Sequence, residues 1–470
     1  MNKLVSIIKK KPSIFLIIGT IIFELIFYAI NTFLDIDAYN LLNIIFLLLV
    51  ITTLSLMIKK KKIDFFYLIF FIGIIIRTIY IYKTSVYENQ HDVLGLLDNG
   101  HLGYIYTLFK SHHLPTTNTW QFYHPPLWHF LGAIWLNIND LFKINISKSI
   151  EGLQILTLLF SSILIIITNN LCTHLKINDK NRYLILSLFA IHPTLILYSG
   201  FINNDCLLLL LESLIIINLI NWYNTPNYKN TILLAITIGL SAMTKANGII
   251  MVIPCIYVFI KKILEKKKEK RNFLRQGILF SIISVPLASW YQIRNYLNFS
   301  SIAIAVPSDH LYIGNHSIFE RFLIFSFKQL FNNNPMKNYN LPSYIVRSST
   351  IGDFQIQNNN ILFKLLIIFN LILIVISIIF TLKYLYSKEK NIIVNTLIIT
   401  WITSLIAMYI FNYKYPYVCS MNIRYISINI YMILMIGYGL NVTSNIKIKK
   451  IIKTVSYIFI FLSILFVFGI

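Results

Sequence analysis

One polar stretch of the chain carries most of the residue types that could act as acids and bases. It contains His91 and Asp92 side by side, and then Asp98, His101 and His124. A carboxylate beside a substrate hydroxyl can remove its proton, and a neighbouring imidazole can assist. We predict Asp92 as the catalytic base with His91 beside it and Asp98 as the alternative; the competing interpretation is a solvated loop acid. His101 and His124 are candidates for contacts with a substrate.

Three basic residues stand at the ends of expected membrane helices, where a lipid headgroup would lie. They are Lys245, Arg294 and Arg424. Lysine and arginine donate charge-assisted hydrogen bonds to phosphate, so these three residues predict a donor phosphate site. The alternative is that their long side chains only reach the phosphates of surrounding lipids. Asp205 begins an expected helix, where N-capping is a complete explanation, and it is a further candidate for the substrate site.

The histidines and cysteines of the chain do not define a metal site. The histidine spacing in the polar stretch fits no zinc signature, and the four cysteines are scattered. We assign no metal and no other cofactor, and a requirement for a divalent metal stays an open alternative. The histidines concerned are His91, His101, His112, His113, His124 and His129.

The elements that must position these residues are membrane-spanning helices. The 470 residues are 57% hydrophobic and only 13% charged, with a mean hydropathy of +0.69. A soluble core could not bury so much apolar surface, and the hydrophobic runs have the length of helices that cross a bilayer. We therefore predict an all-α, polytopic membrane bundle. The net charge of +23 comes from basic residues between the hydrophobic runs, which indicates contact with membrane lipid and excludes nucleic acid as a partner.

The positions of the basic loops predict about thirteen spans, because lysine and arginine favour the cytoplasmic side. Counting 126–142 as a further span would place Lys176, Lys180 and Arg182 outside, so this segment is predicted to be a juxtamembrane helix on the outer surface. The expected spans are 13–34, 41–58, 63–82, 150–171, 183–201, 206–223, 231–244, 248–263, 276–292, 361–383, 391–411, 423–441 and 454–470.

This topology gathers the candidate site residues on the outer side, although only the basic loops determine it. Polar residues at membrane depth are costly, so their presence at one edge favours a site. We divide the chain into a two-span N-terminal extension at 1–62, a catalytic membrane core at 63–300 with an outer loop at 83–149, and a further outer loop with C-terminal spans at 301–470. The residues gathered outside are Asp92, His101, His124, Asp205, Lys245, Arg294 and Arg424.

Several short motifs occur in a characteristic order along residues 63–300. They are HisAsp at 91–92, HisProProLeu at 124–127, HisPro at 192–193 with AsnAsp at 204–205, ThrLys at 244–245 and ArgAsn at 294–295. This order resembles the multi-spanning glycosyltransferases of the C-type fold that use lipid-phosphate sugars. The nearest branches are the protein O-mannosyltransferases and the lipid A aminoarabinose transferases.

The resemblance implies roles for particular residues of this chain. An acid in the first large outer loop would be the catalytic base, a ProPro segment would start a juxtamembrane helix, and a second outer acid would follow the next pair of spans. Family members commonly carry AspGlu or GluAsp where this chain has His91 and Asp92. The choice between Asp92 and Asp98 and the question of a metal therefore stay open.

We expect a membrane glycosyltransferase that moves a sugar from a polyprenyl-phosphate donor to a glycan, lipid or protein acceptor on the non-cytoplasmic face. The resemblance implies inversion at the sugar carbon. The expected location is a bacterial plasma membrane with the site facing outward, or the endoplasmic reticulum membrane in a eukaryote. The alternative is a lipid-linked saccharide transporter or flippase, which should carry polar residues through the bilayer centre and paired repeats. The sequence instead indicates polar residues at one edge.

Overall fold

The computed structural model describes residues 12–34, 40–45, 47–49, 52, 64–301, 312–354 and 360–469. Helices and the turns between them make up this part of the chain, and no strand occurs in it. The backbone pairing of Tyr312 with Tyr417 is an isolated bridge. The predicted all-α class is therefore confirmed for the described residues.

Long α-helices alternate with short helical segments along the chain. The segments marked η are 3-10 helices, except η5, which is a π-helix. In chain order the helices are α2 (Pro12–Phe33), α4 (Phe66–Lys83), α5 (His101–Ser111), η1 (Trp120–Tyr123), α6 (Leu127–Leu141), α7 (Ile146–Glu151), α8 (Gln154–His174), α9 (Asp179–Ala190), α10 (Pro193–Gly200), α11 (Asp205–Asn224), α12 (Tyr228–Thr244), η2 (Ala246–Met251), α13 (Val252–Glu265), η3 (Lys267–Glu269), α14 (Lys270–Phe299), η5 (Phe319–Leu323), α15 (Phe327–Leu330), η6 (Pro335–Lys337), α16 (Leu341–Ile351), α17 (Ile361–Tyr386), α18 (Ile392–Lys414), η8 (Val418–Met421), η9 (Ile423–Tyr431), α19 (Met432–Val442) and α20 (Ile446–Gly469).

Nine stretches of helix in the described residues are long and apolar enough to cross a membrane. A tenth arises if α9 and α10, which are bent by 46° where they meet, count as one span. These helices fit an integral membrane protein. The nine are Ser13–Phe33, Phe66–Lys83, Ile146–His174, Asp205–Asn224, Ala246–Glu265, Lys267–Phe299, Ile361–Tyr386, Ile392–Lys414 and Ile446–Gly469.

The expected count of about thirteen spans is not confirmed, and each difference has a local reason. Most of 41–58 lies outside the described residues, and 183–201 forms the bent pair α9 and α10, which Pro193 separates. Helix α12, expected as 231–244, has only 17 residues. The segment 423–441 is divided, because Ile426 has non-helical angles (φ −137°, ψ 37°) within η9 and α19 has only 11 residues.

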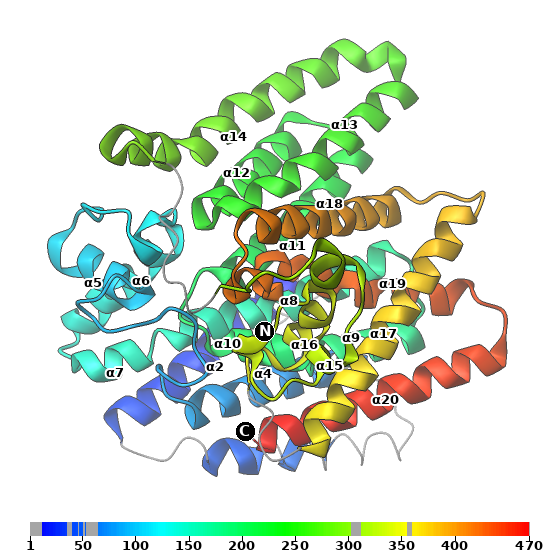
Figure 1. Cartoon of the computed structure of the whole chain (residues 1–470). Coiled ribbons are helices and arrows are strands. Elements are labelled where there is room, and N and C mark those ends of the chain that lie inside the picture. The colour runs from blue at the N-terminus through cyan, green and yellow to red at the C-terminus, as the bar shows by residue number, and fades with distance from the viewer. Residues whose placement is uncertain are drawn as a thin grey trace, which may run out of the picture.

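The helices form groups on either side of a central layer (Figure 1). Helices α12, α13 and α14 lie together at the top of the view, and α12 packs along both α14 and α11. On the opposite side, α17 and α20 pack against one another and α17 also contacts α19. Between these groups, α8 contacts α4, α10 and α11. The largest hydrophobic core cluster includes the buried residues of this central layer.

The bundle has two polar ends, which contacts between distant helix termini define. At one end, Arg182 at the start of α9 contacts Asp64 before α4 at 3.2 Å, and Asn178 donates to Asn441 near the end of α19 at 2.6 Å. Helix α4 runs from this end over 18 residues, about 27 Å, to the loop that carries Asp92. The basic loop at 176–182 and the acidic polar stretch therefore lie at opposite ends of α4.

Arg77, Glu24 and Glu212 are buried ionisable side chains well inside the spans, in contrast to the expectation that polar groups stay at one edge. Arg77 of α4 is fully buried, donates to the Ser161 hydroxyl at 2.8 Å and also bonds the carbonyl of Ala190. That carbonyl has no partner within the helix because α9 ends at Ala190. The guanidinium therefore satisfies an acceptor that the bend leaves unpaired. Glu24 of α2 is buried as well and accepts from the Ser162 hydroxyl at 3.4 Å.

The expected outer loop at 83–149 is itself largely helical. It contains α5, η1 and α6, and α7 begins just before its end. Helix α6 starts at Leu127, directly after Pro125 and Pro126, because proline is tolerated at the start of a helix but not in its interior. Helix α6 has 15 residues and is not one of the nine candidate spans. Its position along the membrane surface stays a prediction.

Candidate functional site

The loop between α4 and α5 holds its polar residues in a strained backbone. Asn89, Asp92 and Leu94 have φ angles of 55°, 57° and 53°, in the left-handed region that non-glycine residues rarely adopt. Such conformations cost free energy and persist where surrounding contacts impose them, often at functional sites. Here the backbone N–H of His101 donates to the Asp92 carbonyl at 2.9 Å. A Cβ on Gly100 would lie 2.2 Å from the Val93 carbonyl oxygen, so this close return of the chain requires glycine.

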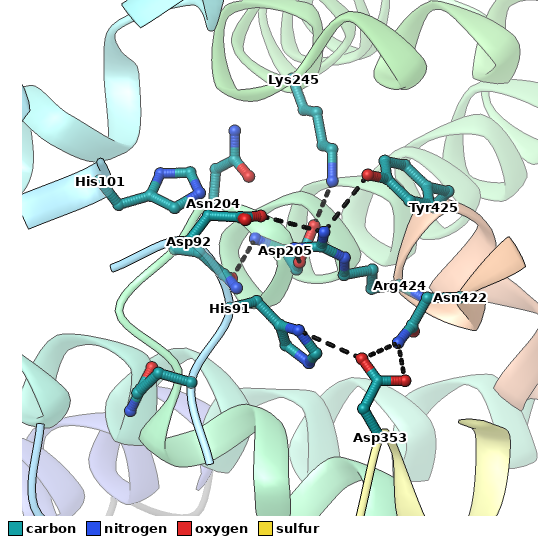
Figure 2. Close-up of polar contacts among 12 residues, drawn as sticks. His91, Asp92, His101, Asn204, Asp205, Lys245, Asp353, Asn422, Arg424 and Tyr425 are labelled. Carbon is teal, nitrogen blue, oxygen red and sulfur yellow. Dashed lines mark hydrogen bonds and ion pairs between the residues drawn. The ribbon is translucent and has the colours of Figure 1, made fainter. Parts of the chain in front are cut away.

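Asp92 forms an ion pair with a residue near the other end of the chain. The guanidinium Nη2 of Arg424 lies 3.0 Å from Asp92 Oδ2, and Nη1 lies 4.0 Å from Asp205 Oδ2 (Figure 2). Arg424 Nη2 also contacts the hydroxyl of Tyr425 at 3.3 Å. Arg424 can reach two carboxylates because η9, to which it belongs, packs against α11. Three predicted site residues, Asp92, Asp205 and Arg424, are thus brought together.

A second ion pair joins the end of α12 to the start of α11. Lys245 follows the last residue of α12 and bonds the carboxylate of Asp205, the first residue of α11; both side chains are buried. The Lys245 ammonium also lies 4.5 Å from the centre of the Tyr425 ring, within cation–π range. The side chain of Asn204 donates to the Thr244 carbonyl at 3.0 Å and holds the two helix ends together.

Asp353 completes the cluster, although no sequence motif singles it out. His91 Nδ1 lies 3.4 Å from Asp353 Oδ2, and the amide of Asn422 donates to both carboxylate oxygens at 2.9 and 3.0 Å. The hydroxyl of Tyr344 donates at 2.6 Å. The one local signal is the Gly352–Asp353 pair in a polar loop: Gly352 has φ +58° after α16 ends and turns the chain so that Asp353 faces the cluster.

The charges of this cluster follow from burial and from its neighbours. Burial would raise the pKa of Asp92, but the positive surroundings, above all the charge and hydrogen bond of Arg424, outweigh it, so the pKa lies below its ordinary value. Burial and Arg424 lower the pKa of His91, and the nearby carboxylates, Asp353 first among them, oppose this only in part. At neutral pH the Asp92 carboxylate is therefore ionised and the His91 imidazole is neutral.

His101 and His124, the two predicted substrate contacts, belong to a buried aromatic stack. His101 Nδ1 lies 3.0 Å from His129 Nε2, and the ring of Tyr104 stacks on His129 with centroids 3.9 Å apart. The ring of His124 stacks on His101 at 5.6 Å. Burial lowers the pKa of all three histidines well below the ordinary value. The stack supports the start of α5 directly behind Asp92, and a contact with substrate stays a prediction.

Two predicted site residues do not join the cluster. Asp98 accepts from the backbone N–H of Gly95 at 2.9 Å in an exposed turn. Arg294 donates to the carbonyl of Pro115 at 2.6 Å and to the Asn295 side chain at 3.0 Å. These contacts anchor the α5–η1 connection on α14. The structure therefore brings together His91, Asp92, Asp205, Lys245 and Arg424, and it separates Asp98 and Arg294 from them.

The described residues contain no group of three or more histidine, cysteine or acidic side chains placed to hold a metal ion. The carboxylates of the cluster are instead occupied by basic side chains, an amide and a hydroxyl. The cluster thus holds two cations, three carboxylates and a neutral imidazole together at one end of a helical bundle. These groups can bind an anion and accept a proton.

A scan of this chain against protein-family models found no match, and a search of curated proteins found none either. The resemblance to glycosyltransferases therefore rests on the motifs, and the function has to be inferred from them and from the geometry of the cluster.

Proposed function

We propose that this protein is a membrane glycosyltransferase that moves a sugar from a polyprenyl-phosphate donor to an acceptor hydroxyl on the non-cytoplasmic face, with inversion. The observation that carries the proposal is the cluster of Asp92 with the buried side chains of Arg424, Asp205 and Lys245. Buried ion pairs seldom stabilise a fold better than apolar packing does, so a cluster of this size favours a chemical role. Its position at the end of the bundle opposite the basic loop at 176–182 supports an outward-facing site.

The two buried cations supply what a leaving phosphate requires. Arg424 and Lys245 converge on Asp205 from η9 and from the end of α12, so their charged groups lie close together. In the proposed reaction a donor phosphate takes the place of the carboxylates at these cations. The cations then neutralise the charge that develops on the phosphate oxygen as the bond to the sugar breaks. The transfer also requires a group that accepts the acceptor's proton, and His91 and Asp92 are both adjacent.

The direct test is transfer by the purified protein. Detergent-solubilised protein is incubated with a polyprenyl-phosphate hexose or pentose labelled in the sugar, together with a lipid extract, an oligosaccharide or a peptide as acceptor. We expect labelled product and an equal amount of released polyprenyl phosphate. Arg424→Gln should abolish both, whereas Asp140→Asn, a change at an exposed acid of α6, should leave both intact. No release from any of these donors would overturn the proposal.

The second candidate is a transporter or flippase for a lipid-linked saccharide. Arg77 and Glu24, which lie buried within the spans, are the observation that favours it. In proteoliposomes, a flippase would make a lipid-linked sugar accessible to an external glycosidase without cleaving its phosphate bond. An enzyme would release polyprenyl phosphate and leave the distribution across the membrane unchanged.

A further inference from the structure

The contact between His91 and Asp353 distinguishes the two adjacent candidates for the proton acceptor. We propose that His91, oriented by Asp353, takes the proton of the acceptor hydroxyl, and that Asp92 instead holds Arg424 in place. This inference rests on the proposed function and adds a positioning residue, Asp353, that lies outside the motifs recognised in the sequence.

Asp353 is held rigidly enough to orient a histidine. The Asn422 amide contacts both carboxylate oxygens, and the Tyr344 hydroxyl donates to Oδ1 at 2.6 Å. Tyr344 is itself buried in α16, and Asn422 lies between η8 and η9, so two separate elements fix the carboxylate. Because its other neighbours are donors, Asp353 keeps the capacity to accept a hydrogen bond from His91, whose Nδ1 lies 3.4 Å from Oδ2.

The geometry selects one form of the His91 ring. Nδ1 faces Asp353 Oδ2 at 3.4 Å (Figure 2), and the tautomer with its hydrogen on Nδ1 would direct that hydrogen to the carboxylate and leave the lone pair on Nε2. The ring of Phe201 lies edge-on to His91 with centroids 5.0 Å apart and restricts its rotation. A carboxylate that binds one nitrogen of an imidazole, while the other accepts a proton, is the arrangement by which enzymes activate hydroxyl groups.

Asp92 is less suited to the same task. Its Oδ2 is 3.0 Å from the guanidinium of the buried Arg424, so proton uptake by this carboxylate would weaken the ion pair that holds Arg424. Proton uptake by His91 instead creates a cation next to Asp353. The charged groups that face His91 are Arg424 from η9, Asp353 after α16, Asp205 from α11 and Asp92 beside it. Asp353 and the other carboxylates offset part of the effect of burial and of Arg424, so they make an imidazolium formed during the reaction less costly than it would be without them.

The proposed step conserves atoms and charge. The acceptor oxygen forms a bond to the sugar carbon while the bond from that carbon to the phosphate oxygen breaks, and the phosphate leaves with the electron pair. The proton of the acceptor hydroxyl moves to Nε2 of His91, and the imidazolium that forms directs its Nδ1–H towards the Asp353 carboxylate. Arg424 and Lys245 hold the departing polyprenyl phosphate. The proton then passes to solvent, which reaches the site because the side chain of His91 is 15% exposed.

The test compares variants of the full-length protein in the transfer assay. His91→Gln should lower turnover by about a hundredfold or more, as expected for loss of a general base, and leave donor binding unchanged. Asp353→Asn should lower turnover by at least about tenfold and move the acid limb of the pH profile to lower pH, because the carboxylate that favours protonation of His91 is lost. Imidazole should restore activity to His91→Gly. The matched control is His113→Gln, at an exposed histidine between α5 and η1.

The outcomes separate the two proposals. If the wild-type protein transfers no sugar and releases no polyprenyl phosphate, the proposed function fails. If the wild type is active and His91→Gln keeps its turnover, the assignment of His91 is wrong. If Asp353→Asn lowers turnover with an unchanged pH profile, Asp353 has only a structural role. Should Asp353→Asn fail to fold, imidazole rescue of His91→Gly decides the assignment alone, and absence of rescue contradicts it.

Discussion

The guanidinium of Arg424 lies 3.0 Å from the carboxylate of Asp92, although 332 positions of the chain separate them. Asp92 belongs to the strained loop after α4, whereas Arg424 belongs to the irregular η9 before α19. The pair therefore joins the N-terminal and C-terminal halves of the bundle at the candidate site. A change at either residue should affect both the site and the attachment of the two halves.

The first prediction concerns donor binding by Arg424. Arg424→Gln should weaken binding of polyprenyl phosphate by about 1.5 to 3 kcal/mol, the range for a hydrogen bond to a charged group. Calorimetric titration in detergent micelles measures the affinity. The control is Lys229→Gln, which removes an exposed cation at the start of α12. Equal affinity in Arg424→Gln and the wild type would mean that Arg424 serves only the ion pair.

The second prediction concerns the buried pair of Lys245 and Asp205. Lys245→Met should lower the free energy of unfolding by about 3 to 5 kcal/mol, because it leaves the buried carboxylate of Asp205 with only the more distant Arg424, 4.0 Å away, as a cation. The double variant Lys245→Met with Asp205→Leu should be more stable than the single one, since no charge remains unpaired. Unfolding of the detergent-solubilised protein provides the comparison. Additive effects of the two substitutions would contradict a direct pair.

The third prediction concerns the backbone of Asp92, whose φ is 57°. Asparagine tolerates the left-handed conformation better than alanine does, so Asp92→Ala should be about 1 kcal/mol less stable than Asp92→Asn. Both substitutions remove the carboxylate and should reduce sugar transfer to a similar extent. Melting temperatures and transfer rates of the two variants test this directly. Identical stability would show that the loop relaxes to another conformation.

The fourth prediction concerns stability at mildly acidic pH. Burial lowers the pKa of His101, His124 and His129 in the folded protein, whereas the unfolded chain titrates near the ordinary value of about 6.5. Below that pH the unfolded state binds protons that the folded state does not, so stability falls as pH decreases. Each histidine contributes up to about 1.4 kcal/mol per pH unit. Unfolding measured between pH 7.5 and 5.5 should show this loss, and His124→Gln should reduce the slope.

The fifth prediction concerns the side of the membrane that the cluster faces. Cys419 is exposed and lies close to Arg424 in the sequence, whereas Cys172, Cys206 and Cys255 are buried. An impermeant maleimide added to intact cells should therefore label the wild-type protein, and Cys419→Ser should abolish the labelling. Labelling that requires permeabilised cells would place the cluster on the cytoplasmic side and contradict the predicted topology.

Much of the fold can be predicted from the sequence, because each membrane span requires a continuous run of apolar residues. A span must be apolar over about twenty consecutive residues, so composition alone indicates the all-α bundle. Asp92, Asp205, Lys245 and Arg424 are polar residues beside such runs, and the structure brings them together. The number of spans was harder to predict from the sequence. The breaks at Pro193 and Ile426 change helix geometry without making the segments less apolar.

The sequence by itself determined that polar residues collect at helix ends, but only the tertiary structure decided which of them meet. Asp353 is an ordinary acid of a polar loop until the packing of α16 and η9 places it beside His91. Arg294 is as basic as Arg424 and also lies near a helix end, yet its partner is the Pro115 carbonyl. The physical reason is that hydrophobicity acts over a short window of sequence. Pairing of charges instead depends on distances between segments that only the packed helices set.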